Sequence, residues 1–180
     1  MVKIWDTDTG ACLGQLSGHE KNVTCVFADQ DGKWIVSGDR DGVIRLWEMS
    51  SGRCLWQTKG HESDVRSLYL AQDGKMLISG GEDRTARLWS IPEGKCENIF
   101  SGHQEGVIGV CLSPDGKLAY STSRDNQFLV WDVSTGECKV FAGTGDLEQW
   151  SLPETDRPYV VLSQERSEEH TSELQSPNTI

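Results

Sequence analysis

Short apolar runs, separated by turns of Asp, Gly and other polar residues, recur along the chain. In one stretch the runs cover residues 65–70, 75–80, 85–90 and 95–100. Asp and Gly favour tight turns, whereas the β-branched and aromatic residues of the runs favour strands. No stretch of useful length shows the periodicity of an amphipathic helix. The pattern therefore predicts an all-β protein in which four short antiparallel strands form each small sheet.

The whole pattern repeats every 42 residues. Tryptophan returns at this step, at Trp5, Trp47, Trp89 and Trp131. The Gly-His pairs follow the same step, at Gly18-His19, Gly60-His61 and Gly102-His103. Self-similarity at such a period indicates an array of identical supersecondary units. One small sheet cannot bury both of its faces alone, so we expect neighbouring units to stack against one another.

Each unit combines a Gly-His pair, an Asp, and a strand that ends in Trp followed by a polar residue. The strand ends are Trp5-Asp6, Trp47-Glu48, Trp89-Ser90 and Trp131-Asp132. This combination resembles the WD-repeat family over residues 1–141. The resemblance implies a β-propeller arc of four-stranded antiparallel blades, with three complete blades flanked by two partial blades.

The pattern breaks at both ends of the repeated region. Residues 2–6 match the third strand of a unit, which indicates truncation, and beyond residue 142 the expected Gly-His pair is Gly143-Thr144. Two weak strand patterns follow, near residues 148–152 and 159–163. We expect residues 1–165 to form an open arc in preference to a closed four-bladed ring.

Residues 166–180 form a separate segment with no relation to the repeat. The run RSEEHTSELQS at residues 166–176 resembles the in-frame translation of a sequencing-library adapter. We therefore expect a non-native read-through tail. A disordered polar tail would explain the composition of this segment but not the match.

Four side-chain types recur together in every full unit. The spacing from His to Asp is 22 residues and from Asp to Trp 6 residues each time. A Ser-His-Asp catalytic set is one interpretation, but an active site is needed once and this set occurs three times. The family resemblance implies instead a buried structural hydrogen-bond network, formed by His19, Ser37, Asp41, Trp47, His61, Ser79, Asp83, Trp89, His103, Ser121, Asp125 and Trp131.

The 180 residues carry a formal net charge of −11, which disfavours direct contact with nucleic-acid phosphates. The charge is spread along the chain, which favours a merely solvated surface over a face that selects basic partners. No N-terminal signal and no membrane-spanning apolar run is present in the sequence. Four of the six cysteines follow the repeat, so we expect small buried residues in a reducing, intracellular and cytoplasmic compartment. The sequence predicts neither a metal site nor a cofactor.

The resemblance implies a non-catalytic protein-interaction scaffold within a larger protein. The docking face would carry the loops before each first strand and after each second strand. Its candidate partner-binding residues are Glu20, Lys21, Asp39, Arg40, Glu62, Asp64, Glu82, Gln104, Glu105 and Arg124. The alternative is a sensor array of a larger signalling enzyme, such as a nucleotide-driven ATPase or a kinase. A complete small propeller acting alone is a third, weaker hypothesis.

Overall fold

The computed structural model describes residues 1–91 and 93–142, and every regular element in this part of the chain is a β-strand. The predicted all-β class is confirmed. The strands are β1 Val2–Trp5, β2 Cys12–Leu16, β3 Val23–Ala28, β4 Trp34–Asp39, β5 Val43–Glu48, β6 Cys54–Lys59, β7 Val65–Leu70, β8 Met76–Gly81, β9 Thr85–Ser90, β10 Cys96–Ser101, β11 Val107–Leu112, β12 Leu118–Ser123, β13 Phe128–Asp132 and β14 Cys138–Ala142.

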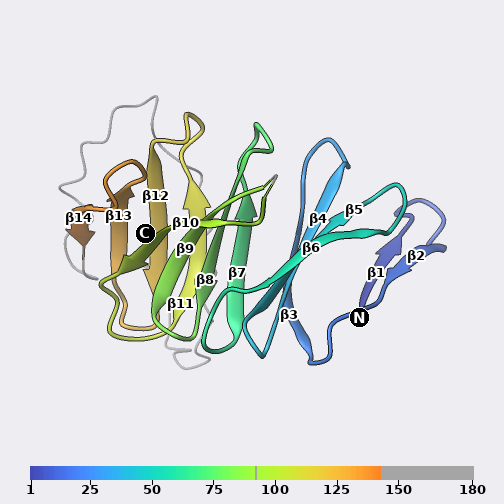
Figure 1. Cartoon of the computed structure of the whole chain (residues 1–180), viewed down its shortest axis with the longest axis horizontal. Coiled ribbons are helices and arrows are strands. Elements are labelled where there is room, and N and C mark those ends of the chain that lie inside the picture. The colour runs from blue at the N-terminus through green and yellow to red at the C-terminus, as the bar shows by residue number, and fades with distance from the viewer. Residues whose placement is uncertain (92, 143–180) are drawn as a thin grey trace, which may run out of the picture.

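The strands form four antiparallel sheets. The leading sheet contains only β1 and β2, and it is followed by sheet 1 (β3-β4-β5-β6), sheet 2 (β7-β8-β9-β10) and sheet 3 (β11-β12-β13-β14). In Figure 1 the sheets stand side by side in chain order, from the leading sheet on the right to β14 on the left, and they do not close a ring. The predicted arc of four-stranded blades is therefore confirmed.

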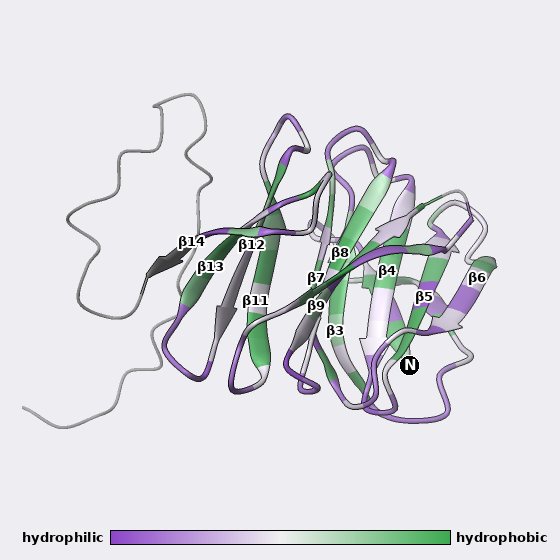
Figure 2. Ribbon diagram, turned by 60° about the vertical axis from the view of Figure 1, so that its left-hand side comes forward, coloured by the Kyte–Doolittle hydropathy of each residue, from purple (hydrophilic) through white to green (hydrophobic). Residues whose placement is uncertain are grey.

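In the three complete sheets, the first strands lie along one edge of the row. Strand β7 contacts both β3 and β11, so the first strands of successive sheets are neighbours. The fourth strands β6, β10 and β14 lie at the opposite edge of their sheets. The turns between strands are hydrophilic and the strands largely hydrophobic, as Figure 2 shows. This arrangement brings all the loops before first strands and after second strands to the same face, which we call the loop face.

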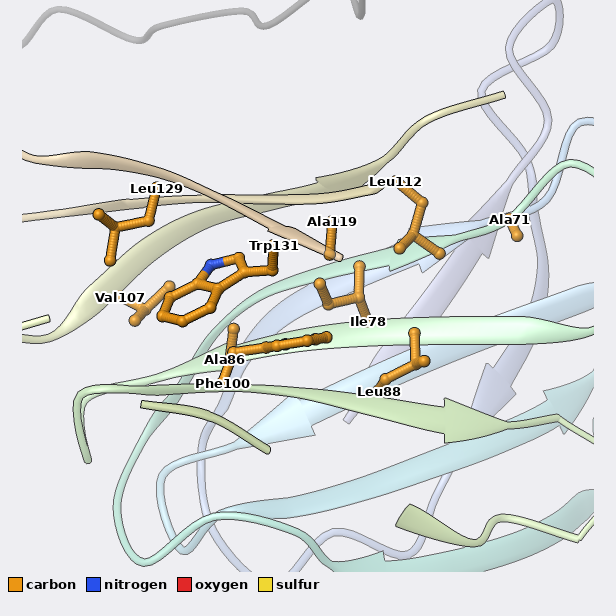
Figure 3. Packing of buried hydrophobic residues seen from close by; sticks show 10 residues of the cluster. All are labelled: Ala71, Ile78, Ala86, Leu88, Phe100, Val107, Leu112, Ala119, Leu129 and Trp131. Atoms are coloured by element: carbon orange, nitrogen blue, oxygen red, sulfur yellow. The ribbon is translucent and has the colours of Figure 1, made fainter. Parts of the chain in front are cut away.

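Apolar side chains fill the space between adjacent sheets. Between sheets 2 and 3, Trp131 packs on Phe100 with ring centroids 5.4 Å apart, and Ile78, Ala119 and Leu112 continue the contact (Figure 3). A second cluster joins sheets 1 and 2, and a smaller one joins the leading sheet to sheet 1. Because each sheet buries its faces against its neighbours, the stacking predicted from the repeat is the main source of the hydrophobic core.

The glycine of each Gly-His pair lies under the tryptophan of the following sheet. A Cβ atom on Gly60 would stand 2.7 Å from Cζ2 of Trp89, and one on Gly102 would stand 2.9 Å from Cη2 of Trp131. No side chain fits at these distances without moving the indole ring. The repeated glycine is therefore required by close packing between two sheets.

A side chain on the fourth strand links sheet 1 to sheet 2, and another links sheet 2 to sheet 3. Nε1 of Trp56 on β6 donates to the carbonyl oxygen of Ile91 at 2.7 Å, and Nδ2 of Asn98 on β10 donates to that of Val133 at 2.6 Å. Trp56 and Asn98 occupy the same repeat position although they share little chemistry. These two bonds tie a fourth strand to the turn after the third strand of its neighbour.

The expected burial of the cysteines is wrong. Cys12 and Cys138 are exposed, and Cys25, Cys54, Cys96 and Cys111 are only partly buried. The repeated cysteines begin the fourth strand of each sheet, where one side of the strand has no further strand beside it. Burial raises the pKa of the Cys25 and Cys111 thiols to about 11, so these two stay protonated at neutral pH.

Several predictions fall outside the described residues. These are the strands near 148–152 and 159–163, the trailing partial blade, and the division of the chain into residues 1–165 and a read-through tail at 166–180. They stay predictions.

Candidate functional site

The recurring His, Ser, Asp and Trp side chains meet inside each of the three complete sheets. In sheet 2, Nε1 of Trp89 lies 2.9 Å from Oγ of Ser79, and Nε2 of His61 lies 2.7 Å from the same oxygen. Nδ1 of His61 lies 2.9 Å from Oδ1 of Asp83. An indole can only donate, so the Ser79 hydroxyl accepts from Trp89 and donates to Nε2. The imidazole then donates from Nδ1 to the carboxylate.

Sheet 3 repeats this geometry with a weaker last contact. Ser121 Oγ lies 2.9 Å from Nε1 of Trp131 and 2.7 Å from Nε2 of His103. Nδ1 of His103 stands 3.3 Å from Oδ2 of Asp125, whose carboxylate also accepts from the backbone N–H of Gln104 at 2.7 Å. Asp125 therefore fastens the loop after β10 to the turn after β12.

Sheet 1 departs from the expected set. Ser37 lies 2.8 Å from Nε1 of Trp47 and 2.7 Å from Nε2 of His19, as expected, but Nδ1 of His19 contacts Asp39 at 2.6 Å. The prediction that Asp41 completes this network is wrong. Asp41 is exposed, and its backbone N–H donates to Oδ1 of Asp39 at 3.0 Å.

A glycine in sheet 2 explains why Asp39 takes the place expected for Asp41 in sheet 1. Asp39 stands at the repeat position of Gly81, where a Cβ atom would lie 2.4 Å from Nδ1 of His61. A side chain at this position is therefore aimed at the imidazole. In sheet 1 the Asp39 carboxylate fills that place, and Asp41 is left outside. Asp39 is also only 2% exposed, which leaves little of its side chain for contact with a partner; its assignment as a partner-binding residue stays a prediction.

Burial and hydrogen bonding set the ionisation of these networks. Burial lowers the pKa of His19 and of His103, and the nearby carboxylates Asp39 and Asp125 only partly oppose it. Burial raises the pKa of Asp83, but hydrogen bonds from His61, from the backbone of Glu62 and from Thr85 outweigh it and hold this pKa far below its usual range. These shifts favour the neutral imidazole at His19 and His103 and the ionised carboxylate at Asp83.

The networks are closed to substrates. His61 and Ser79 are both 0% exposed, so neither atom that a nucleophilic mechanism would use can reach a bound molecule. Each indole N–H, serine hydroxyl and imidazole nitrogen of the three networks already has a partner within its network. What the arrangement can do is fix the loop face of each sheet in one geometry.

The candidate docking residues divide into three groups. Asp39 is buried in a network. Glu20, Lys21, Glu62, Gln104 and Glu105 are exposed on the loop face. The other four take part in ion pairs between sheets, namely Arg40, Asp64, Glu82 and Arg124.

The ion pairs form a continuous strip across the three complete sheets. Nε of Arg40 lies 3.9 Å from Oδ2 of Asp64, and Arg66 reaches Asp64 at 3.5 Å and Glu82 at 2.7 Å. Glu82 in turn contacts Nη1 of Arg124 at 2.7 Å. Sequence reasoning missed Arg66, because its role depends on two residues that only the fold brings beside it.

Within 1–91 and 93–142 no three His, Cys, Asp or Glu side chains are grouped so that they could hold a metal ion. In the same ranges no helix is long and apolar enough to cross a membrane.

Comparison with known proteins places these observations in a family. The WD40 family model (WD domain, G-beta repeat) matches residues 10–48, 52–90 and 94–132. Each match spans the fourth strand of one sheet and the first three strands of the next. The fold and the repeated networks thus define a WD40-repeat protein. Since the matches cover more than half of its length, the chain belongs to the WD domain, G-beta repeat family.

Curated relatives match short stretches of the chain. A stretch of 45 residues, 25% of this chain, is 38% identical to 6% of "Probable coatomer subunit beta'" of Schizosaccharomyces pombe. A stretch of 44 residues, 24% of this chain, is 43% identical to 10% of "Nuclear distribution protein PAC1" of Arthroderma benhamiae. The chain therefore matches a tenth or less of the length of these relatives.

Solved structures match more of the chain. "Structure of U3-55K" and "Crystal structure of RRP9 WD40 repeats" each superpose with a TM-score of 0.67 and 29% sequence identity. Both superpositions cover 71% of this chain, and they cover 41% and 40% of the respective neighbours. These neighbours support the interpretation of the row of sheets as part of a propeller.

Proposed function

We propose that this chain is a non-catalytic scaffold that binds other proteins or peptides on its loop face. The observation that carries the proposal is the threefold hydrogen-bond network, which is buried, internally satisfied and repeated in each complete sheet. Such a network stabilises a platform and offers no unique reactive centre. WD40 repeats generally mediate protein–protein interactions, which agrees with this role.

The loop face supplies the variation that recognition needs. Glu20, Glu62 and Gln104 stand at one repeat position and are all exposed, although the surrounding frame is constant. Different side chains on a constant frame give a surface whose charge changes from sheet to sheet. The net charge of −11 is spread along the chain, so basic partners stay a prediction for the surface outside the loop-face ion pairs.

The alternative, a sensor array of a larger signalling enzyme, stays a prediction. A phosphate-binding GxxxxGKS/T loop or kinase motifs elsewhere in the full-length protein would favour it. Both hypotheses assign the same binding role to the chain described here.

Site-specific photo-crosslinking in the host cell tests the proposal. A photoreactive residue replaces Glu62 on the loop face in one variant and Gln72, in the β7–β8 turn at the opposite end of the sheets, in a matched control. We expect Glu62 variants to crosslink to a defined set of proteins and Gln72 variants to give far less product. Equal labelling from both positions, or a hydrolytic turnover that depends on His61, would contradict the scaffold role.

A further inference from the structure

The arginines in the strip of ion pairs on the loop face differ in the number of carboxylates that they contact. Arg66 lies in the middle and contacts two carboxylates, Asp64 and Glu82. Arg40 and Arg124 lie at the ends, and each contacts one carboxylate. A guanidinium group has five N–H donors, so the terminal arginines retain donors that the strip itself does not use.

Both terminal arginines face solvent. The Arg40 side chain is 63% exposed and that of Arg124 is 52% exposed, whereas Asp64 and Glu82 are 21% and 29% exposed. The distance of 3.9 Å between Arg40 and Asp64 exceeds a hydrogen bond. A partner carboxylate could thus bind Arg40 or Arg124 while the central pairs stay intact.

An open hollow lies beside the Arg40 end of the strip. It has a volume of about 520 Å³ and is lined by Met1, Lys21, Asn22, Val23, Thr24 and Arg40. Two of the lining side chains are cations, two are neutral hydrogen-bonding groups, and none is a carboxylate. This lining favours an anionic side chain over a cationic one.

Within the loop face, the strip and the hollow form a positive patch beside exposed acids. The strip and hollow contain four cations, Lys21, Arg40, Arg66 and Arg124, against the two carboxylates Asp64 and Glu82, which gives a local net charge of +2. The full chain carries −11. The exposed acids Glu20, Glu62 and Glu105 also stand on the loop face, but none of them is paired with the strip in the described structure.

An apolar residue continues this surface in sheet 3. Ile108 occupies the repeat position that Arg66 holds in sheet 2, and it is 45% exposed. Arg124 belongs to the same sheet, and its backbone N–H donates to the carbonyl oxygen of Gly106 at 3.2 Å, two residues before Ile108. A branched apolar side chain beside the positive strip provides a contact that charge alone does not.

We propose that this strip binds an acidic segment of a partner protein, with carboxylates on Arg40, Lys21 and Arg124 and an apolar side chain on Ile108. The inference rests on the scaffold function and specifies its partner chemistry. Arginine suits this task because its planar donors match both oxygens of a carboxylate. The internal pairs with Asp64 and Glu82 hold the strip in place before the partner arrives, which reduces the ordering cost of binding.

Fluorescence anisotropy with two labelled peptides tests this proposal on the full chain. One peptide consists of Glu, Asp and Leu residues, and the other carries Lys in place of every acidic residue. We expect the acidic peptide to bind and its affinity to fall as salt is added. The R40Q/R124Q double variant should weaken binding by about tenfold or more. The matched control K75Q/K117Q removes two exposed cations from turns at the opposite end of the sheets and should not weaken it.

The outcomes of this experiment show whether the strip binds an acidic segment. No binding of the acidic peptide, or binding that the double variant leaves unchanged, would overturn the proposal. A thermal melt of the double variant that matches the parent chain excludes unfolding as the cause of any loss. If the lysine peptide binds instead, the acidic-partner inference fails and the scaffold function stands; the photo-crosslinking at Glu62 tests that function separately.

Discussion

Asp39 accepts a hydrogen bond from Nδ1 of His19 at 2.6 Å, at the place where Asp83 meets His61 in the next sheet. The two aspartates reach the same point from positions two residues apart in the repeat. Oδ1 of Asp39 also accepts from the backbone N–H groups of Asp41 and Val43, each at 3.0 Å. One buried carboxylate thus holds both the imidazole and the turn after β4.

The substitution Asp39→Ala removes this acceptor. It leaves the Nδ1–H group of His19 and two backbone N–H groups without partners, so we expect a loss of about 2 kcal/mol in the free energy of unfolding. The matched change Asp41→Ala affects an exposed side chain and should stay within about 0.5 kcal/mol of the parent. Urea unfolding of both variants measures the difference, and equal losses would restore Asp41 to the network.

The His61→Ala variant tests the network where it is complete. The Ser79 hydroxyl would lose its acceptor, the Asp83 carboxylate would lose one of its donors, and a cavity would remain in a fully buried site. We expect the free energy of unfolding to fall by about 3 kcal/mol. Glu62→Ala, next along the chain but exposed, serves as the control in the same denaturant titration. A His61→Ala variant as stable as that control would argue against a structural role for the network.

Gly60→Ala probes the contact between a Gly-His pair and the next sheet. The added methyl would stand 2.7 Å from Cζ2 of Trp89, so the indole must shift from its packed position at a cost of about 2 kcal/mol. In Gly14→Ala the nearest atom would be Cδ1 of Ile4 at 3.9 Å, which is ordinary contact. Calorimetry should show a lower Tm for Gly60→Ala only. Unchanged Trp fluorescence and Tm in both variants would contradict this packing argument.

Trp56→Phe removes the bond between β6 and the turn that follows β9. The smaller Phe ring keeps an aromatic group at this place while the donor to the carbonyl oxygen of Ile91 is lost, so a reduction of about 1 kcal/mol in stability is expected. Trp34→Phe is the matched control, because no described residue accepts a hydrogen bond from the Trp34 indole. An equal loss of thermal stability in Trp56→Phe and Trp34→Phe would contradict a contribution from the Trp56 hydrogen bond.

Stability should also depend on pH through the buried histidines. Burial lowers the pKa of His19 and His103 in the folded chain below the ordinary 6.5. The unfolded chain therefore binds more protons in this range, and stability is fully present above pH 6.5 and declines as the pH falls below it. Protonation at Nε2 would also put a second donor against Ser37 or Ser121. Urea unfolding midpoints between pH 8 and 5 measure the effect. A midpoint that rises on acidification would contradict the predicted loss of stability.

The strands were predictable because their boundaries depend on local sequence. The strand predicted at 75–80 lies at Met76–Gly81, and that predicted at 95–100 lies at Cys96–Ser101. Asp and Gly turn residues and β-branched runs act over a few neighbouring positions, so they are visible along the chain. The 42-residue step then extends the same boundaries to every unit.

Where the structure differs from the sequence predictions, the difference depends on contacts that residue spacing cannot show. Asp41 has the same spacing from His19 as Asp83 has from His61, yet the residue two positions earlier decides which carboxylate enters the network. Arg66 becomes part of the ion-pair strip only because the fold places Asp64 and Glu82 on either side of it. Trp56 and Asn98 form equivalent bonds with unrelated side chains, so no residue pattern marks that position.

The matched repeats and the sheets are out of step by one strand, because each match begins on the fourth strand of one sheet and ends on the third strand of the next. A gene duplication that copies one such unit would therefore complete the sheet before it and start the sheet after it. Repeated duplication could lengthen the array one unit at a time, and no intermediate would contain an additional incomplete sheet. The offset makes an increase in repeat number a small evolutionary step.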